Sequence, residues 1–393
     1  MVIGASTAGL FSAYLLAKGG IPVCVYDQAE ELGPPARTLI LTSRIIDVLG
    51  EVLSQAIVNR TQTVQLFSPQ RSIHIRLNEP DLIVERQALV RLLAEKARAA
   101  GAEIHLGYRF LGLEPARHGL VLNLEGPQGE RIEPIRTQAL IGADGVNSQV
   151  AKAAGCRSRV TISLLQARVA MPPWARADTT QVWFDPQSTR YFYWLVPESD
   201  EHAVVGLIAE DQRQARESLD HFLVARDLEP LSYQGAQVPF SMGESPLCKG
   251  GDESHILLVG DAASQVKVTT VGGVVTGLCG AQAAARAILQ GSDYRRELAG
   301  LHRELGLHLL VRRILNHFTA ADYDRLLALV NHRTRGVLAA HNRDEVVKVL
   351  GSSVLAQPRL LWLAAQPLLR SVTPLRKPKG ERTSQARRRV SVR

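Results

Sequence analysis

The sequence predicts an α/β fold in three parts: a parallel-sheet domain built from separated pieces of the chain, an inserted β-sheet domain, and a helical C-terminal region. Two observations predict the parallel sheet. A strand–turn–helix–strand pattern opens the chain, and a buried strand followed by an Ala-rich helix returns after residue 254. The stretches between them alternate between apolar and polar residues, which indicates further sheets.

Composition limits the class of protein. The chain has 393 residues, of which 46% are hydrophobic and 21% charged. This is ordinary globular composition, with enough length for two or three domains. It excludes a disordered chain, a disulfide-stapled miniprotein and a fibrous repeat.

The net charge of +8 is concentrated at the C-terminal end, where residues 370–393 hold nine Lys or Arg and one Glu. Residues 1–369 therefore balance. A nucleic-acid-binding domain would carry its basic stripe on a folded surface, so no nucleic-acid partner is expected. Two interpretations of the tail stay open. With the apolar stretch before it, the tail would contact an anionic membrane surface, or it is a solvated, disordered segment.

Cys24, Cys156, Cys248 and Cys279 lack the spacing of metal ligands, which favours a reduced, cytoplasmic protein with no metal site. The N-terminus has no positive region of the signal-peptide kind. The best apolar stretch, Val354–Leu369, contains two prolines and an arginine. No membrane-spanning helix is expected.

The first elements follow from apolar runs and their stop signals. Val2 and Ile3 end a strand, Leu10–Lys18 is a helix stopped by two glycines, and Ile21–Tyr26 is a buried strand. The later elements, in chain order, are a hairpin over 63–78, a helix over Gln87–Ala100, a β-meander over 103–141, a strand-rich block over 160–239 with strands Gln181–Phe184, Tyr191–Val196 and Ala203–Ala209 and a helix over 211–225, a strand over His255–Val259, and a helix over Val274–Gln290. After Asp293 the pattern is helical up to the basic tail.

The turn Gly4-Ala-Ser-Thr-Ala-Gly9 carries the strongest chemical signal. In a dinucleotide fold the first glycine makes the tight turn, a small middle residue (here Ser6) lets the backbone approach a pyrophosphate, and the last glycine lets the helix pack on the strand. Asp27 ends the next strand, where a ribose-binding acid is expected. The alternative is a plain tight turn.

Two further carboxylates follow apolar strands, in Asp144-Gly145 and in Gly260-Asp261. The carboxyl ends of strands are where open α/β sheets bind ligands. For each site alone, a capped turn is the alternative, because Asp favours turns and helix N-caps.

These three motifs together resemble the FAD-dependent hydroxylase superfamily typified by p-hydroxybenzoate hydroxylase. The stretch Gly-Asp-Ala-Ala-Ser-Gln-Val-Lys-Val-Thr-Thr-Val-Gly-Gly-Val, residues 260–274, is similar to the geranylgeranyl reductase branch. The resemblance implies a Rossmann-like FAD-binding domain with FAD as cofactor. The cofactor-binding residues that it implies are Gly4, Ser6, Ala8, Gly9, Asp27, Arg37, Arg86, Asp144, Gly260, Asp261, Gly272 and Gly273.

By the same resemblance, Asp27 would bind the adenosine ribose and Asp261 the ribityl chain. The backbone N–H groups of Gly272 and Gly273, with a helix N-terminus, would stabilise the negative charge of reduced flavin. Two alternatives stay open: Arg86 as a solvated residue that opens a helix, and Gly272-Gly273 as a flexible loop.

The substrate side rests on the stretch Phe192-Tyr-Trp194-Leu-Val-Pro197, which is similar to the branch's substrate-cavity strand. Phe192 and Trp194 are therefore expected to bind substrate, with a core strand of alternating aromatics as the alternative. The helices around Asp322–Val330 and Ser353–Leu369 also resemble the branch. The sequence departs from the branch pattern at residues 33–38, where a Cys-Gly is absent, and at Val268 and Val271, which replace a Pro and a Gly.

The predicted domains are 1–60, 84–158 and 252–295 for FAD binding, 61–83 and 159–251 for the substrate domain, 296–369 for the helical region and 370–393 for the tail. No second glycine fingerprint follows a strand, so a separate NAD(P)H domain of the glutathione-reductase type is not expected. The expected electron donor is external, either NAD(P)H or ferredoxin. No catalytic residue is identified. His302, His308 and His317 are assigned to structural or surface positions.

The resulting hypothesis is an FAD-dependent oxidoreductase, cytoplasmic and peripheral on a membrane, that reduces double bonds of a geranylgeranyl or polyprenyl lipid. Two alternatives stay open. One is an FAD-dependent monooxygenase of the same superfamily, and the other is a membrane-recruited FAD- or lipid-binding protein without chemistry.

Overall fold

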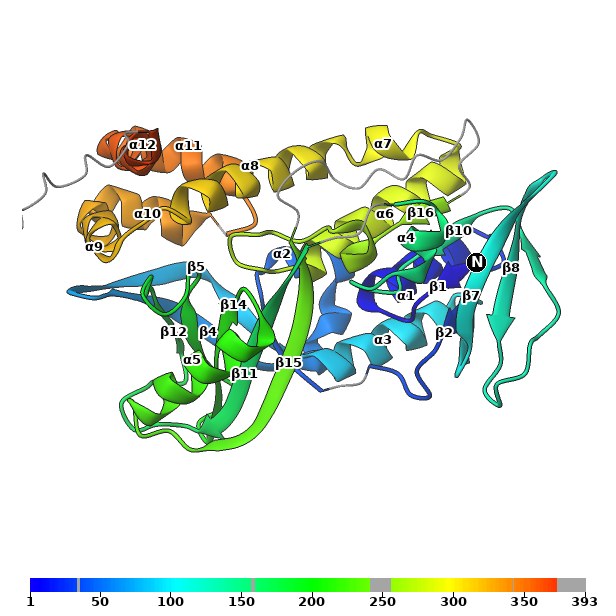
Figure 1. The fold of residues 1–393 in the computed structure, drawn as a ribbon, viewed down its shortest axis with the longest axis horizontal. Helices are drawn as coiled ribbons and strands as arrows, with labels where there is room; N and C mark the ends of the chain where they lie inside the picture. The colour runs from blue at the N-terminus through cyan, green and yellow to red at the C-terminus, as the bar shows by residue number, and fades with distance from the viewer. Residues whose placement is uncertain (34–35, 157–159, 241–255, 342, 373–393) are drawn as a thin grey trace, which may run out of the picture.

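A computed structural model describes residues 1–33, 36–156, 160–240, 256–341 and 343–372 (Figure 1). The basic tail beyond residue 372, Cys248 and His255 therefore lie outside the described residues. The mixed α/β architecture confirms the predicted fold class.

Five short parallel strands form sheet A, in the order β16-β10-β1-β2-β6. Helices cover one face with a core that includes Val25, Leu93 and Leu278, and a three-stranded sheet, sheet C, covers the other. The strands are β1 (Val2–Ile3), β2 (Cys24–Asp27), β6 (Glu103–Leu106), β10 (Leu140–Gly142) and β16 (Ile256–Leu258); the helices are α1 (Thr7–Lys18), α3 (Arg86–Ala99) and α6 (Val274–Gln290); sheet C consists of β7 (Arg109–Ala116), β8 (Gly119–Glu125) and β9 (Ile135–Thr137).

The predicted β-meander over 103–141 is wrong at both ends. β6 pairs in parallel with β2, and β10 pairs in parallel with β1, so only the middle strands form an antiparallel meander. These end strands have three or four residues, too few for alternation to separate a parallel from an antiparallel strand.

Sheet B has eight strands in the order β15-β11-β14-β13-β12-β4-β5-β3. The predicted hairpin over 63–78 is confirmed as β4 and β5, which pair from Ser68 and Arg71 at the turn. Helix α5 (Gln212–Val224) packs on one face of sheet B. The strands are β3 (Thr38–Leu41), β4 (Ile57–Ser68), β5 (Arg71–Glu85), β11 (Val160–Ala170), β12 (Thr179–Trp183), β13 (Tyr193–Pro197), β14 (His202–Ala209) and β15 (Pro230–Phe240).

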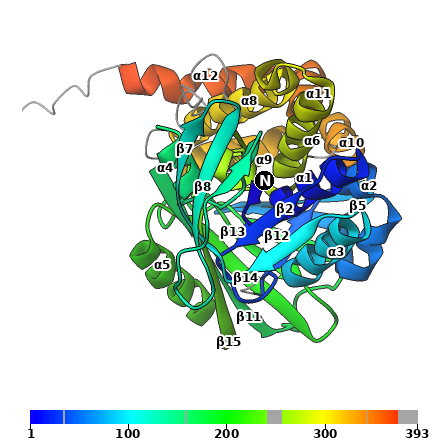
Figure 2. The same cartoon turned by 90° about the vertical axis from the view of Figure 1, so that its right-hand side faces the viewer.

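The C-terminal helices run along one side of the molecule, from sheet A past sheet B (Figures 1 and 2). They are α7 (Tyr294–Glu297), α8 (Ala299–Leu315), α9 (Ala320–Leu329), α10 (His332–Ala340), α11 (Val346–Ala356) and α12 (Arg359–Val372); two further short helices are α2 (Arg44–Leu49) and α4 (Gln149–Ala153), and η1 (Glu51–Ala56) and η2 (Gly260–Ala263) are 3₁₀ turns. Among the described residues, no helix has the length and apolarity needed to cross a bilayer.

Two of the cysteines, Cys24 and Cys279, are free thiols, whereas Cys156 is disulfide-bonded. The disulfide at Cys156 differs from the reduced state that the cysteine spacing favours, and the two free thiols do not test that expectation.

Candidate cofactor and substrate site

The glycine turn after β1 admits no side chain. A Cβ on Gly4 would lie 2.4 Å from the carbonyl oxygen of Ala143, and Gly4 has φ of +107°. A Cβ on Gly9 would lie 2.1 Å from the carbonyl oxygen of Gly4. Only glycine lets α1 start this close to sheet A. The first residues of α1 line a cavity, so its N-terminal N–H groups form an anion-binding edge there.

Side chains around this turn are fixed by backbone groups. The Ser6 hydroxyl accepts the N–H of Gly9 at 3.2 Å and caps α1. The two carboxylate oxygens of Asp27 accept the N–H groups of Ala5, at 2.5 Å, and Ala29, at 2.8 Å. Asp27 also lines the cavity, next to the anion-binding edge. Its position suits a ribose hydroxyl.

Asp144 lines the same cavity, but its carboxylate is committed to α4. It accepts the Ser148 hydroxyl at 2.5 Å and the N–H of Gln149 at 2.7 Å. These contacts are those of the capped turn given as the alternative for this motif.

The motif at Gly260 lets α1 and α6 approach each other. Gly260 has φ of +62°, and its Cβ would lie 3.2 Å from that of Ala8. A Cβ on Gly277 of α6 would lie 3.2 Å from the Cα of Gly260. Asp261 is half-buried and lines the cavity, with its Oδ1 3.1 Å from the position of a Cβ on Gly273. The carboxylate thus stands beside the loop that precedes α6.

Two arginines bring positive charge to this end of the cavity. Burial lowers the pKa of Arg37 to about 10, with repulsion from Arg86 adding to the effect and Asp261 opposing it. Burial also lowers the pKa of Arg86, whose Nη1 donates to the carbonyl of Gly33 at 3.2 Å. Both line the cavity and stay charged near neutral pH, which suits a diphosphate.

The loop before α6 keeps a glycine-like backbone without the glycine. Val271 has φ of +54°, a left-handed conformation that is strained for a β-branched residue. The departure from the branch pattern at Val271 therefore changes the residue and leaves a conformation that glycine would favour. Gly273 caps α6 with no side-chain hydrogen bond from the described residues, so the helix N-terminus opens to the cavity.

The cavity has a volume of about 760 Å³ and extends from these motifs to the inner face of sheet B. Phe192 and Trp194 both line it, whereas Tyr193 between them points to the opposite face and stacks on Phe222 at 4.2 Å. Gly206 makes room for Trp194, because a Cβ there would lie 2.6 Å from the indole. The remaining apolar lining on this side includes Val64, Leu66, Leu164, Val182, Phe184, Tyr191, Val196, Val204 and Val238.

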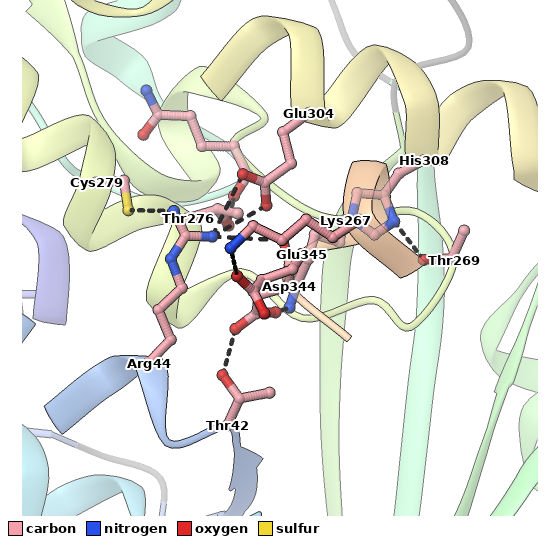
Figure 3. A network of polar contacts seen from close by, with 12 residues as sticks. Thr42, Arg44, Lys267, Thr269, Thr276, Cys279, Glu304, His308, Asp344 and Glu345 are labelled. Atoms are coloured by element: carbon pink, nitrogen blue, oxygen red, sulfur yellow. Dashed lines mark hydrogen bonds and ion pairs between the residues drawn. The ribbon is translucent and has the colours of Figure 1, made fainter. Parts of the chain in front are cut away.

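Sequence reasoning missed a group of charged residues in the cavity wall. Lys267 forms an ion pair with Asp344 (Figure 3). Arg343 forms another with Asp81 at 2.6 Å. All four line the cavity. The signal available in the sequence was a single lysine inside an apolar run, Val266-Lys267-Val268.

Sequence spacing also gave no sign of a second cluster, which lies outside the cavity lining. Cys24 of β2 and Glu103 and His105 of β6 place one potential metal-ligand atom each within 4.8 Å of one another. Cys24 and Glu103 are cross-strand partners, so the pairing of β2 with β6 brings them together.

Comparison with known proteins decides the family. A family model described as an FAD binding domain matches residues 1–291. The chain belongs to this FAD-binding family. FAD is its cofactor. The glycine turn before α1 and the two arginines fit the pyrophosphate of FAD, the turn at Gly260 fits the ribityl chain, and the open N-terminus of α6 fits the flavin ring.

Individual relatives and solved structures are also similar to this flavoprotein. The chain is 27% identical to a digeranylgeranylglycerophospholipid reductase of Methanothermobacter thermautotrophicus, over 83% of this chain and 88% of the relative. A geranylgeranyl bacteriochlorophyll reductase-like protein of Thermoplasma acidophilum has a similar structure, with a TM-score of 0.78 and 20% identity, over 93% of this chain and 98% of the other. The flavin-dependent brominase Bmp2 is similar with a TM-score of 0.64 and 16% identity, over 94% and 98%. The chain is an FAD-dependent oxidoreductase that is similar to proteins named geranylgeranyl or digeranylgeranyl lipid reductases.

Proposed function

We propose that this flavoprotein reduces double bonds of an isoprenoid lipid. The observation that carries the proposal is the single cavity in which the FAD-binding turns meet an apolar, aromatic-lined wall of sheet B. The name of the Methanothermobacter relative supports a lipid with geranylgeranyl chains as the substrate class. The electron donor, NAD(P)H or ferredoxin, stays an expectation from the sequence.

The residues of this chain would divide the work along the cavity. The N-terminus of α1, with Arg37 and Arg86, would bind the diphosphate of FAD, and Asp27 would bind its ribose. Asp261 and the N–H groups of Gly272 and Gly273 would hold the ribityl chain and the polar ring edge. Bound FAD would supply a hydride when reduced.

The apolar wall would position the lipid. Phe192 and Trp194 offer flat hydrocarbon surface to a polyprenyl chain, and neighbouring valines complete the lining. A chain that fills this space excludes water and oxygen from the reacting carbons. No hydrogen-bonding group is needed to recognise an isolated double bond, which suits a wall of this composition.

The direct test is anaerobic reoxidation of the flavin. The FAD-loaded protein is reduced with dithionite and mixed with digeranylgeranylglycerophospholipid, and flavin absorbance and product mass are followed. The proposal predicts reoxidation and a product heavier by pairs of hydrogens, while the saturated diphytanyl lipid leaves the flavin reduced. Reduced flavin that ignores the lipid but reacts rapidly with air in the presence of an aromatic ligand would favour the monooxygenase. Bound flavin that no donor reduces would favour the binding protein.

A membrane contact would deliver such a substrate, and the C-terminal helices offer an apolar surface for it. Leu355, Leu361 and Trp362 are 84%, 59% and 68% exposed on α11 and α12, immediately before the basic tail. Exposed apolar side chains that precede clustered basic residues in the sequence suit an anionic bilayer. Co-sedimentation with phosphatidylglycerol vesicles, but not phosphatidylcholine vesicles, is expected, and Trp362→Ser would weaken it. Equal recovery with both lipids would reject the contact.

A further inference from the structure

Lys267 lies in the loop between η2 and α6, fully inside the protein. Its side chain is 6% exposed, and its ammonium forms an ion pair with Asp344, whose side chain is 0% exposed (Figure 3). The second carboxylate oxygen of Asp344 accepts the hydroxyl of Thr42, the residue after β3. Three segments far apart in the sequence therefore converge on one amine.

The amine lies at the cofactor end of the cavity. A Cβ on Gly272 would be 3.5 Å from the Lys267 Nζ and 3.7 Å from the Thr270 hydroxyl. The backbone N–H of Lys267 also donates to the carbonyl of Gly272 at 3.1 Å. All three residues line the cavity, and the Thr270 hydroxyl is buried without a hydrogen-bond partner among the described residues. The ammonium thus lies next to Gly272, in the loop that is expected to hold the flavin ring.

The charges around Lys267 come from every element packed against it. From the segment after α10, Arg343 pairs with Asp81 of β5 at 2.6 Å. From α2, Arg44 pairs with Glu304 of α8 at 3.3 Å. With the Lys267–Asp344 pair, these form three cations and three anions, so the charges of the three pairs balance. Two uncharged titratable neighbours complete the surroundings, Cys279 of α6 and His308 of α8.

Burial lowers the pKa of Lys267 to about 7. Repulsion from Arg343 adds to this effect, and attraction to Glu304 opposes it. Burial and the nearby lysine together lower the pKa of His308 to about 3, so that imidazole stays neutral near pH 7 and does not compete for the proton. Burial raises the pKa of the Cys279 thiol, which therefore keeps its own proton. The exchangeable proton of this group of side chains resides on Lys267.

Adding hydrogen across a carbon–carbon double bond needs a hydride and a proton. We propose that Lys267 is the acid that supplies the proton, held in place by Asp344; this rests on the proposed reductase function. The hydride from reduced flavin forms one C–H bond, and the π-electron pair forms the second with a proton from the ammonium. The ammonium becomes a neutral amine and regains a proton from water. Asp344 pairs with the ammonium, and Lys267 itself lines the cavity.

The proposal has a signature that needs no lipid. Reduction of bound FAD would place negative charge near Lys267, and a nearby negative charge raises the pKa of an amine. Above about pH 7 the reduced protein therefore holds a proton that the oxidised protein lacks. Anaerobic potentiometric titration of the FAD-loaded protein, repeated across pH, counts protons taken up per two electrons. The wild type is expected to take up more protons than Lys267→Met above about pH 7.

Two further variants separate acid chemistry from charge alone. Lys267→Arg keeps a cation that does not titrate, so it should match Lys267→Met in proton count while binding FAD as the wild type does. Lys348→Met, an exposed lysine of α11, should behave as the wild type. In single turnovers with digeranylgeranylglycerophospholipid, the Lys267→Arg variant should slow reoxidation by about 100-fold or more.

The results divide cleanly. An equal proton count for wild type and Lys267→Met at every pH would overturn the proposal, and so would unimpaired reoxidation of the Lys267→Arg variant. If neither variant folds, the wild type alone decides, because a potential whose pH dependence shows no extra proton above about pH 7 also overturns it. If the extra proton is present but no isoprenoid lipid reoxidises the flavin, the proposed function fails while the redox-linked protonation of Lys267 stands.

Discussion

The two ends of the cavity are built by different physical means. At the cofactor end, a Cβ on Gly4 or Gly9 would lie 2.4 or 2.1 Å from a backbone oxygen, which leaves no room for a side chain, and the 3.2 Å contacts at Gly260 and Gly277 are tight, so the backbone itself forms much of the binding surface. At the apolar end, side chains from many strands form the surface, and Phe192 and Trp194 reach it only because alternate residues share a face. We therefore expect the first end to tolerate fewer substitutions than the second.

The largest expected effect comes from a substitution at the cofactor end. Gly9→Ala places a Cβ 2.1 Å from the carbonyl oxygen of Gly4, so α1 must move away from sheet A. Urea denaturation should show a loss of about 3 kcal/mol, and FAD affinity should fall by at least about tenfold. Gly306→Ala is the matched control, since this glycine of α8 has open space around it and should gain about 0.5–1 kcal/mol. Full FAD affinity in Gly9→Ala would contradict the steric account.

The same contrast explains what the sequence could predict. The glycine turns, α1 and α6 could be predicted from the sequence because the steric constraints that define them involve only a few adjacent residues. The membership of β6 and β10 in sheet A could not be predicted, because strands this short show no periodicity. The Lys267–Asp344 pair joins residues far apart on different elements, and only the packing of the C-terminal segment against the loop before α6 brings them together. The predicted domain boundaries stay a prediction.

The charged wall next to the cofactor end should make stability depend on pH. The folded pKa of Lys267 is about 7, below the ordinary value of 10.5, so between these values the unfolded chain binds a proton that the folded chain does not. The free energy of unfolding should therefore rise with pH in this window, by up to about 1.4 kcal/mol per unit. Denaturation series for wild type and Lys267→Met should diverge there, with the rise confined to the wild type. Parallel curves would show that the lysine does not titrate in the folded protein.

The next prediction concerns the role of the apolar end in substrate binding. Trp194→Ala removes part of the cavity wall, so kcat/KM for the isoprenoid lipid should fall by about tenfold or more while FAD affinity stays unchanged. Trp183 is the matched control. It lies on the adjacent strand, stacks on Phe67 at 5.1 Å and packs against the α5 face, so Trp183→Ala should lower stability without a comparable loss of kcat/KM. Equal kinetic losses in both variants would mean that the wall is not the substrate surface.

The smallest effect tests whether the loop between the two ends is strained. Val271→Gly removes a buried side chain but relieves a left-handed valine, so the two contributions oppose each other and stability should change by less than about 1 kcal/mol. Val268→Gly lacks the relief, because Val268 is not among the residues with positive φ, and it should cost about 2 kcal/mol or more. The difference between the two denaturation midpoints measures the strain, and identical losses would show that there is none.

The central claim is that one cavity holds FAD at its glycine-lined end and an isoprenoid chain at its aromatic end. A crystal structure of the protein with FAD and digeranylgeranylglycerophospholipid tests it most directly. The account predicts the diphosphate at the N-terminus of α1, the flavin ring against Gly272 and Gly273, and a prenyl double bond between the ring and Trp194. A lipid chain bound elsewhere, with the sheet B wall occupied by protein side chains or water, would contradict it.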